Sequence, residues 1–244
     1  MSSKLHNTEL KPHAILDKVS RTNKANKISH FLSLSDEKKY KAILEIGTGS
    51  GYIANYFSEH YNWSDGVYAV DVSDQRIETE GYEFSRVNNT ILPYNSSMFD
   101  YIVSNHVIEH VGGRDEQINH LNEIHRCLSD DGVLYLAVPN RWRLVEPHYK
   151  LPFLSWFPES IASFYMRLFK RGDYYDCKPL TNRDLKQLLD NSGFEYYEAT
   201  IDAISVVSQL EGGHLTKLVG KLPKFIWKPF SIIMPTLIYL CRKP

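Results

Sequence analysis

Cysteine is scarce in this chain of 244 residues, with three at Cys127, Cys177 and Cys241. An odd number at such wide spacing excludes a complete disulfide framework, and no CxxC pair of the kind that binds zinc or exchanges disulfides is present. The fold must therefore rest on a hydrophobic core, and a chain of this length can bury one.

The chain also lacks an excess of charge and an uninterrupted apolar stretch long enough for a bilayer. Its formal net charge is −1, without the basic surplus typical of nucleic-acid-binding proteins, so we expect no nucleic-acid partner. Residues 215–241 are apolar, but four lysines and three prolines divide them into short runs. Residues 1–17 have no apolar signal-like core, and we expect a cytoplasmic protein.

Short apolar runs alternate with helical patterns over residues 41–140. The runs predict strands at 41–46, 66–70, 99–103 and 132–138, and the patterns predict helices at 52–61, 73–80 and 115–128. A further helix is expected within residues 10–34. Strands that alternate with helices indicate an α/β fold with a doubly wound, mainly parallel sheet.

The alternation stops after Pro139 and resumes at Thr181. Residues 141–180 are rich in aromatic residues and predict a helical cap insertion, which we call the cap. A helix at 181–191 follows, with Thr181 as N-cap, Asp184 three residues on and Gly193 past its end. Strands are predicted at 194–205 and 236–242. The expected regions are a helical segment at 1–40, a ligand-binding core at 41–140, the cap, and the completion of the sheet at 181–244.

A glycine loop, Gly47, Gly49 and Gly51, joins the first predicted strand to its helix. In an open α/β sheet, ligands bind at this carboxyl edge. A dinucleotide-binding loop would need glycine or alanine where Tyr52 stands, and no Gly-Lys-Ser/Thr follows as in a phosphate-binding P-loop. The carboxylate of Glu45 would repel a pyrophosphate and suit a ligand that carries an ammonium group, as S-adenosylmethionine does.

Asp71 ends the second predicted strand, twenty residues after Gly51. A carboxylate at this place can accept hydrogen bonds from both ribose hydroxyls, which fits any adenosine-type ligand. This residue alone does not distinguish between the cofactors.

Four runs follow one another in a characteristic order: ILEIGTGSGY, YAVD, LPYNSSMFDYIVSNHVIEHV and IHRCLSDDGVLYLAVPN. Over residues 41–140 the chain resembles the class I S-adenosylmethionine-dependent methyltransferases of the small-molecule and quinone-biosynthesis type. The resemblance implies a Rossmann-like seven-stranded sheet with S-adenosyl-L-methionine as cofactor.

The resemblance also implies a set of cofactor-binding residues. Those that line the methionine and ribose portions are Glu45, Gly47, Thr48, Gly49 and Gly51, with Asp71 on the ribose. Val72 packs on the adenine, and Asn88, beside Asn89, stands where the family usually has an aspartate that reads the adenine amino group. Asn105 and His106 border the methionine portion.

The segment 106–110 also matches HxxEH, a zinc-peptidase pattern in which two histidines bind the metal. Because the segment directly follows a strand in a methyltransferase-like order, we predict no metal site. His110 fits either a helix-start residue that bonds the backbone or a residue that faces the substrate. His120 and His125 are expected to be exposed.

The cap follows a strand that opens at the same edge as the glycine loop, so it is a candidate substrate wall. Its EPHY and LPF runs resemble segments of methyltransferases in surface-glycan pathways. We predict methyl transfer to a small-molecule, glycan or lipid-linked acceptor, at a hydroxyl. His148 and His110 are the candidate catalytic bases, with Glu146 or Glu109 as orienting partners.

Two other functions stay open: a non-catalytic regulator that binds S-adenosylmethionine, and a nicotinamide-dependent oxidoreductase on a similar fold. Tyr52 and Glu45 argue against the oxidoreductase.

Four lysines at spacings of four, three and four predict a basic amphipathic helix at 215–231. Such a helix favours peripheral contact with the inner face of the membrane. The competing interpretation is a cap helix that packs on the aromatic insert.

Overall fold

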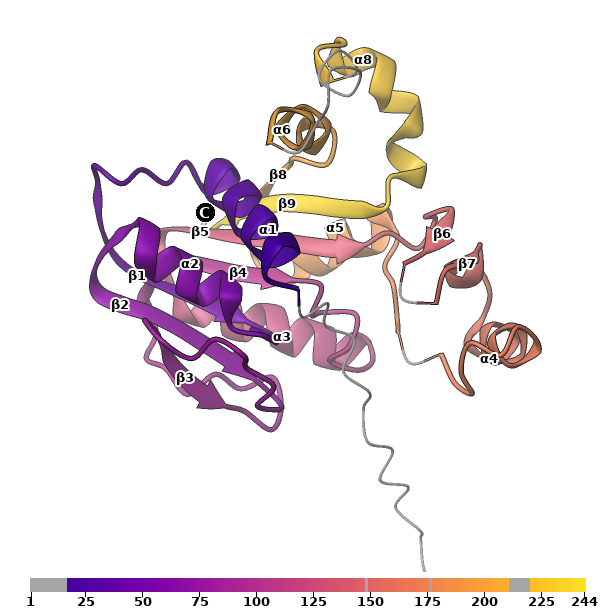
Figure 1. The fold of residues 1–244 in the computed structure, drawn as a ribbon, viewed down its shortest axis with the longest axis horizontal. Helices are drawn as coiled ribbons and strands as arrows, with labels where there is room; N and C mark the ends of the chain where they lie inside the picture. The colour runs from indigo at the N-terminus through magenta and orange to yellow at the C-terminus, as the bar shows by residue number, and fades with distance from the viewer. Residues whose placement is uncertain (1–16, 148, 176, 211–219) are drawn as a thin grey trace, which may run out of the picture.

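The structure is a computed structural model that describes residues 17–147, 149–175, 177–210 and 220–244 (Figure 1). Within them, one sheet contains the strands β1 (Lys39–Ile46), β2 (Asn62–Asp71), β3 (Glu83–Arg86), β4 (Phe99–Asn105), β5 (Leu128–Pro139), β8 (Glu195–Glu198) and β9 (Thr236–Arg242). Their order is β3-β2-β1-β4-β5-β9-β8. The first five are parallel, whereas β9 lies antiparallel between β5 and β8. The predicted seven-stranded, mainly parallel sheet is confirmed.

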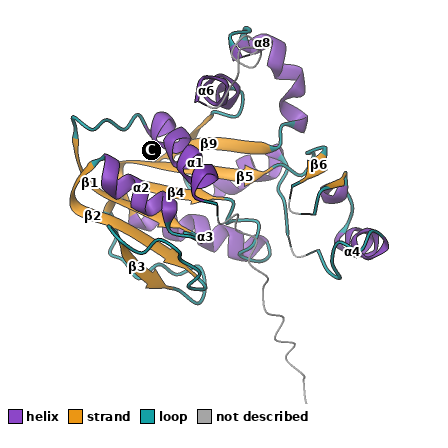
Figure 2. Cartoon of the chain, in the orientation of Figure 1, coloured by secondary structure: helices purple, strands orange, loops and turns teal. Residues whose placement is uncertain are grey.

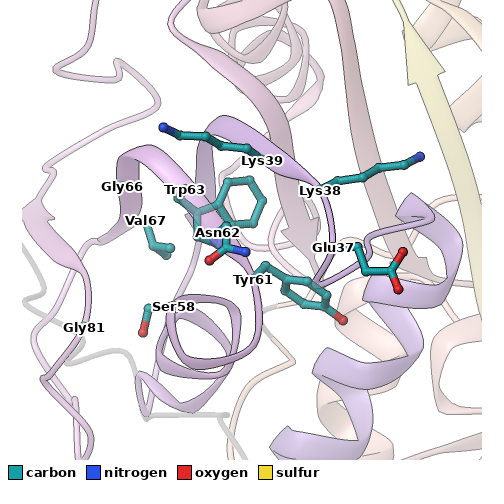
Figure 3. Close-up of a pocket in the computed structure, with 10 residues that line it drawn as sticks. All are labelled: Glu37, Lys38, Lys39, Ser58, Tyr61, Asn62, Trp63, Gly66, Val67 and Gly81. Atoms are coloured by element: carbon teal, nitrogen blue, oxygen red, sulfur yellow. The ribbon is translucent and has the colours of Figure 1, made fainter.

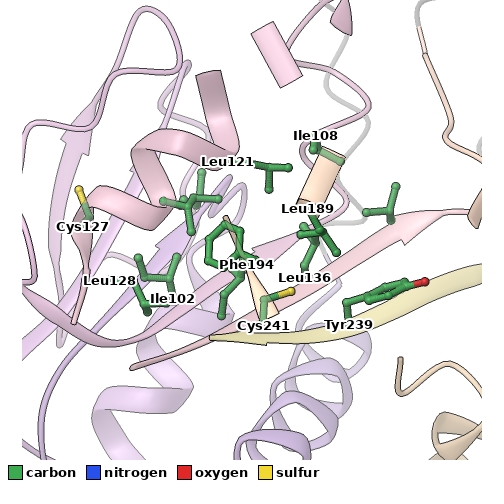
Figure 4. Close-up of a cluster of buried hydrophobic side chains, with 14 of the residues drawn as sticks. Ile102, Ile108, Leu121, Cys127, Leu128, Leu136, Leu189, Phe194, Tyr239 and Cys241 are labelled. Atoms are coloured by element: carbon green, nitrogen blue, oxygen red, sulfur yellow. The ribbon is translucent and has the colours of Figure 1, made fainter. Parts of the chain in front are cut away.

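Helices cover both faces of the sheet (Figures 1 and 2). On one face lie α1 (Lys18–Leu32), α2 (Tyr52–His60) and α6 (Asp202–Leu210), and on the other lie α3 (Arg114–Cys127) and α5 (Asn182–Asn191). Each face has its own buried cluster; Figure 4 shows the one beneath α3 and α5, which includes Leu121, Leu189 and Phe194. The arrangement is the predicted doubly wound α/β fold.

The helix expected within residues 10–34 is α1, and residues 10–16 lie outside the described part. Its N-cap is Asp17, whose carboxylate accepts a hydrogen bond from the Ser20 amide. The capping box predicted for α5 is also present, because the Thr181 hydroxyl accepts from the Asp184 amide at 3.1 Å. Gly193 follows with a φ of +73°.

The helix predicted at 73–80 is wrong. Residues 72–80 form an irregular loop that is bound to the glycine loop, since the amides of Ile77 and Glu78 both donate to the Ser50 carbonyl at 3.0 Å. The Asp74 side chain accepts from the amide of Arg76 and pairs with its guanidinium, which supports a local turn there. The strand β3, which the sequence analysis did not predict, follows.

The strand predicted at 194–205 is too long. β8 ends at Glu198, and the Thr200 hydroxyl then accepts the hydrogen bond of the Ile238 amide from β9, where a strand would offer a carbonyl. The chain turns there into α6, whose first turn is supported by a bond from the Ala203 amide to the Ala199 carbonyl.

The cap contains a small hairpin of β6 (Val145–Glu146) and β7 (Leu151–Pro152), a 3-10 turn η1 (Leu154–Trp156) and the helix α4 (Glu159–Leu168). It continues from the carboxyl end of β5 and places α4 on the far side from the sheet (Figure 1). Its own buried cluster comprises Leu151, Leu154, Ala162, Met166, Tyr175 and Cys177.

The helix predicted at 215–231 is wrong in its described part; residues 215–219 fall outside it. Here the chain forms α8 (Lys224–Trp227) and then the 3-10 helix η2 (Lys228–Ile233). Pro223 is the N-cap of α8 and Pro229 is the second residue of η2. Lys221 therefore lies in a turn before α8, and Lys224 and Lys228 lie in two different helices. Lys224 forms an ion pair with Asp202 of α6. No helix of the described residues is long and apolar enough to cross a membrane.

Candidate active site

The glycine loop lies between the end of β1 and α2, and its three glycines have φ values of +74°, +55° and +83°. A Cβ at Gly47 would lie 2.5 Å from a methyl carbon of Val107, and one at Gly51 would lie 2.0 Å from the carbonyl oxygen of Glu78. Glycine is therefore required at both positions by conformation and by space.

Asp71 closes the loop from the neighbouring strand. Its Oδ2 accepts a hydrogen bond from the Gly49 amide at 2.9 Å, and its Oδ1 accepts from the Ser73 amide at 3.3 Å. The amide of Gly47 donates to the Val70 carbonyl at 2.8 Å, which ties the loop to the end of β2. A half-buried carboxylate thus stands at the carboxyl edge of the sheet.

Glu45 is a buried carboxyl at this edge. It alternates along β1 with the residues of the α3 face, so it points with Ile43 toward α1 and α2. Its Oε2 accepts from the Thr48 hydroxyl at 2.7 Å. Burial raises the pKa of Glu45 to about 8, against the opposing effects of the Thr48 hydrogen bond and the charge of Arg21.

Helix α1 brings Arg21 and Lys24 to the same place, and the sequence analysis missed both. Burial, reinforced by the charge of Arg21, lowers the pKa of Lys24 to about 8, while the charges of Glu45 and Glu109 oppose the shift. A signal was present, because Arg21 precedes the buried Ala25, Ile28 and Leu32 at the helical spacing that puts it on the same face.

Three of the predicted adenine-side residues are exposed beyond the end of β2. Val72 is 51% exposed although it is apolar, and Asn88 and Asn89 lie on the loop after β3. That loop is joined to Asp71, whose carbonyl accepts from the Val87 amide at 2.9 Å. The side chain of Asn89 accepts from the Ile91 amide at 2.8 Å and shapes its own turn.

Asn105 ends β4 and is half-buried, and His106 follows with a φ of +60° while its amide donates to the Ala137 carbonyl at 2.8 Å. This conformation is uncommon for a residue other than glycine and marks a sharp turn at the sheet edge. The turn places two histidines around one carboxylate: Oε1 of Glu109 lies 3.5 Å from Nδ1 of His106 and 3.9 Å from Nε2 of His110.

Glu109 is buried, and its Oε2 has no hydrogen-bond partner among the described residues. Burial opposes its ionisation, but the hydrogen bond from His106 and the charges of His106 and His110 hold the pKa of Glu109 below its usual value. Burial lowers the pKa of His106, and Glu109 opposes that shift. A carboxylate between two imidazoles can orient either ring and stabilise its protonated form.

The cap contributes a second buried charge pair. Nη2 of Arg143 lies 2.5 Å from Oε1 of Glu146, and Oε2 of Glu146 accepts from the Tyr149 amide at 2.8 Å. Both oxygens of Glu146 are thus engaged within the cap. His148 lies outside the described residues. The Lys178 amide donates to the Glu109 carbonyl at 3.0 Å, so the cap returns to the sheet edge beside Glu109.

The expected exposure of His120 is wrong. It is buried between α3 and β4, where its Nε2 lies 3.1 Å from Oγ of Ser104, and burial lowers its pKa to about 4. His125 is half-buried, with its ring against the edge of Phe194.

A pocket of about 560 Å³ lies at the opposite edge of the sheet, beside the amino ends of β1 and β2 (Figure 3). Lys39, Asn62 and Trp63 line it together with Gly81, and the glycine loop does not. Because this pocket lies at the amino ends of the strands, it is not part of the site around the glycine loop. In the part of the chain that the structure describes, no three His, Cys, Asp or Glu side chains are grouped as metal ligands would be.

Comparisons with known proteins agree with this geometry. The model of a methyltransferase domain family matches residues 16–199. No curated protein shows significant sequence similarity to the chain.

Many solved structures share the fold at low sequence identity. A Haloferax volcanii protein in complex with the Trm112 methyltransferase activator has a TM-score of 0.56 at 14% identity, over 93% of each chain. The Burkholderia thailandensis 1,6-didemethyltoxoflavin-N1-methyltransferase, with S-adenosylhomocysteine bound, has a TM-score of 0.52 at 16% identity, over 92% of this chain and 79% of that one.

A third structure is Haemonchus contortus phosphoethanolamine N-methyltransferase 2, with phosphomonomethylethanolamine and S-adenosylhomocysteine bound. It has a TM-score of 0.53 at 16% identity, over 91% of this chain and 53% of that one. With the family match over most of its length, the chain belongs to the class I S-adenosylmethionine-dependent methyltransferases and uses S-adenosyl-L-methionine as methyl donor.

Proposed function

We propose that this methyltransferase acts on a hydroxyl of a small-molecule, glycan or lipid-linked acceptor, held between the carboxyl edge of the sheet and the cap. The observation that carries the proposal is the His106–Glu109–His110 cluster, which lies next to the glycine loop and beneath the returning chain of the cap. This cluster offers a general base at the place where the hydroxyl of the substrate would meet the methyl donor.

The described residues fit the methyl donor. Gly47 and Gly51 leave no room for a Cβ against Val107 and the Glu78 carbonyl, so glycine holds the loop in the shape that we assign to the methyl donor. We assign Glu45 to the ammonium group, Asp71 to the ribose hydroxyls and the exposed Val72 to the adenine. The basic residues Arg21 and Lys24 suit the carboxylate of the methionine portion. The remaining assignments are Thr48 and Gly49 in the loop, Asn88 and Asn89 beside the adenine, and Asn105 with His106 near the methionine.

When bound, the donor supplies an electrophilic methyl group on a sulfonium. The protein has to align the acceptor oxygen for in-line attack and keep water out. His110 takes the proton from the hydroxyl, and Glu109 stabilises the imidazolium through Oε1. His106 holds the same Oε1 from the other side, so the carboxylate stays fixed during the proton transfer. His148 stays the second candidate base, and Glu146, which binds Arg143 and the Tyr149 amide, stays its proposed orienting partner.

The test compares His110→Ala with Asp71→Ala. We expect His110→Ala to lower kcat ~100- to 10,000-fold, as loss of a general base does, with S-adenosylhomocysteine affinity unchanged. Asp71→Ala should weaken that affinity ~10- to 100-fold, because a hydrogen bond to a charged group contributes about 1.5 to 3 kcal/mol. Turnover is followed by mass spectrometry of products that gain one methylene from a pool of glycan and lipid-linked acceptors.

His125→Ala is the matched control, since His125 lies on α3 with its ring against Phe194, away from the glycine loop. Near-full turnover in both His110→Ala and His148→Ala would show that neither histidine is the base. The methyltransferase activity itself would still be established, because products are formed. Methylation of nitrogen or carbon alone would reject the hydroxyl acceptor.

The described part of 215–231 does not form the single basic helix on which the predicted membrane contact was based. A contact there would depend on exposed apolar side chains instead. The exposed apolar side chains of its described part are Leu222, Phe225, Ile226 and Phe230. Without a stripe of lysines, these residues are only the alternative anchor to the one argued from the cap below, and the vesicle experiment described there distinguishes the two.

A further inference from the structure

Helix α4 is oriented with its larger apolar side chains outward. Ala162, Ser163 and Met166 are buried against the rest of the cap. On the opposite side, Ile161, Phe164 and Leu168 are 50%, 60% and 65% exposed, at the spacing that aligns them along one helical face. A surface helix of a globular protein normally turns its larger apolar side chains toward the core. The exposed apolar face of α4 therefore indicates a contact with a partner or a membrane.

Aromatic rings extend the outer face of α4 at both ends. Phe157 before the helix and Phe169 after it are 38% and 52% exposed. Beside the hairpin of the cap, the ring of Trp156 in η1 packs on Trp142 and Phe153 at centroid distances of 5.5 and 4.9 Å, and all three rings remain partly exposed. Tryptophan rings of this kind favour the headgroup level of a bilayer.

The same segment is basic. The cap, residues 141–180, contains seven lysines and arginines against four aspartates and glutamates, a formal charge of +3 in a chain whose total is −1. The exposed cations are Lys150, Arg167, Lys170 and Arg171, and no ion pair joins them to a carboxylate of the described residues. The apolar face is thus bordered by positive charge that no described side chain neutralises.

We propose that the outer face of α4 and the adjoining aromatic residues dock onto an anionic lipid bilayer. Ile161, Phe164 and Leu168 enter the boundary between headgroups and acyl chains, while Lys170 and Arg171 meet lipid phosphates. A second copy of the chain fits less well, because a two-fold contact would bring the same cations against each other.

Docking would bring the reacting edge to the membrane, since the cap continues from β5 and its chain returns beside Glu109. A lipid-linked acceptor could then reach His110 without leaving the bilayer. This consequence rests on the proposed function, whereas the docking itself does not and is tested without turnover.

The experiment is sedimentation of the full chain with phosphatidylcholine vesicles that contain 30% phosphatidylglycerol, at low and high salt. The variant Ile161→Ser/Phe164→Ser/Leu168→Ser should reduce the partition coefficient at least ~100-fold, because each buried methylene favours the membrane by about 0.8 kcal/mol. Lys170→Gln/Arg171→Gln should reduce it ~30-fold at low salt, about fivefold for each charge, with little change at high salt.

The matched control is Leu222→Ser/Phe225→Ser/Phe230→Ser, which removes exposed apolar residues outside the cap. We expect it to bind vesicles like the wild type, and all variants to bind S-adenosylhomocysteine with wild-type affinity. Loss of binding in this control with full binding in the α4 variant would move the anchor to the C-terminal segment and overturn the proposal. Wild-type protein that stays in the supernatant at low salt, or an α4 variant that only changes from dimer to monomer, would overturn it too.

Discussion

Glu45 shows at the scale of one residue how a buried carboxyl, which we propose binds the ammonium group of the cofactor, lowers the stability of the protein. The pKa of this buried carboxyl is raised to about 8 from an ordinary value of 4.5. A carboxyl with a raised pKa contributes its full stability below pH 4.5, and that contribution is lost as the pH rises through 8. A ligand that brings an ammonium group would compensate the buried negative charge.

We therefore predict opposite effects of Glu45→Gln on stability and on binding. Without ligand the variant should resemble the wild type at pH 4.5 and exceed it at pH 9 by at least about 1 kcal/mol, or about 2 to 4 °C in Tm. Its affinity for S-adenosylhomocysteine should fall at least ~10-fold, the equivalent of about 1.4 kcal/mol. Thermal unfolding at both pH values and calorimetry measure these effects. An equal difference in Tm at both pH values would contradict the buried ionisation.

Residues of the glycine loop could be predicted because their reasons are local. Glycine at positive φ and a carboxylate at each strand end leave a direct mark on the sequence, and the structure places Glu45, Gly49 and Asp71 together at the edge. The burial of Lys24 was harder to predict from the sequence, since it depends on how α1 packs over the sheet. Burial of His120 was missed for the same reason: its partner Ser104 comes from another element.

At the scale of elements, the loop 72–80 shows how a tertiary contact overrides a helical pattern. Two amides that a helix would use internally bind the Ser50 carbonyl instead. The Tyr82 hydroxyl also donates to the Glu78 carbonyl at 2.5 Å, which holds that carbonyl against Gly51. The hydrophobic period of a sequence predicts which face of a helix would be apolar. It does not show that the amides will find hydrogen-bond acceptors in another loop.

The variant Gly51→Ala tests this contact. Its Cβ would collide with the Glu78 carbonyl, and alanine is strained at the φ of +83°, so we expect a loss of at least about 2 kcal/mol and ~4 °C in Tm. Cofactor affinity should fall with it, because the loop 72–80 must shift. Gly66→Ala is the matched control, with a φ of +105° but only the Tyr68 ring within reach, at 3.9 Å. Equal losses of stability in the two variants would show that φ strain alone acts.

At the scale of the whole molecule, the chain combines a large sheet domain with a small cap. The ends of the cap meet, because the Arg141 amide donates to the Leu180 carbonyl at 3.0 Å. The two clusters of the sheet are extensive, while that of the cap comprises six buried residues. This supports the proposed boundary at 141–180 and suggests that the cap opens before the sheet unfolds.

The reactivity of the three cysteines in urea can show whether the cap opens before the sheet. Cys127 at the end of α3 and Cys241 in β9 are fully buried in one cluster of the sheet domain, and Cys177 is 8% exposed in the cap. Burial raises the pKa of all three thiols, so each should react slowly with iodoacetamide in the native protein. We expect Cys177 to become reactive in urea at least about 1 M below the other two, since a small cluster needs less denaturant to open. Mass spectrometry of the labelled peptides measures each midpoint, with Cys177→Ser as the control that removes only the early label. A single midpoint for all three cysteines would mean that cap and sheet unfold as one unit.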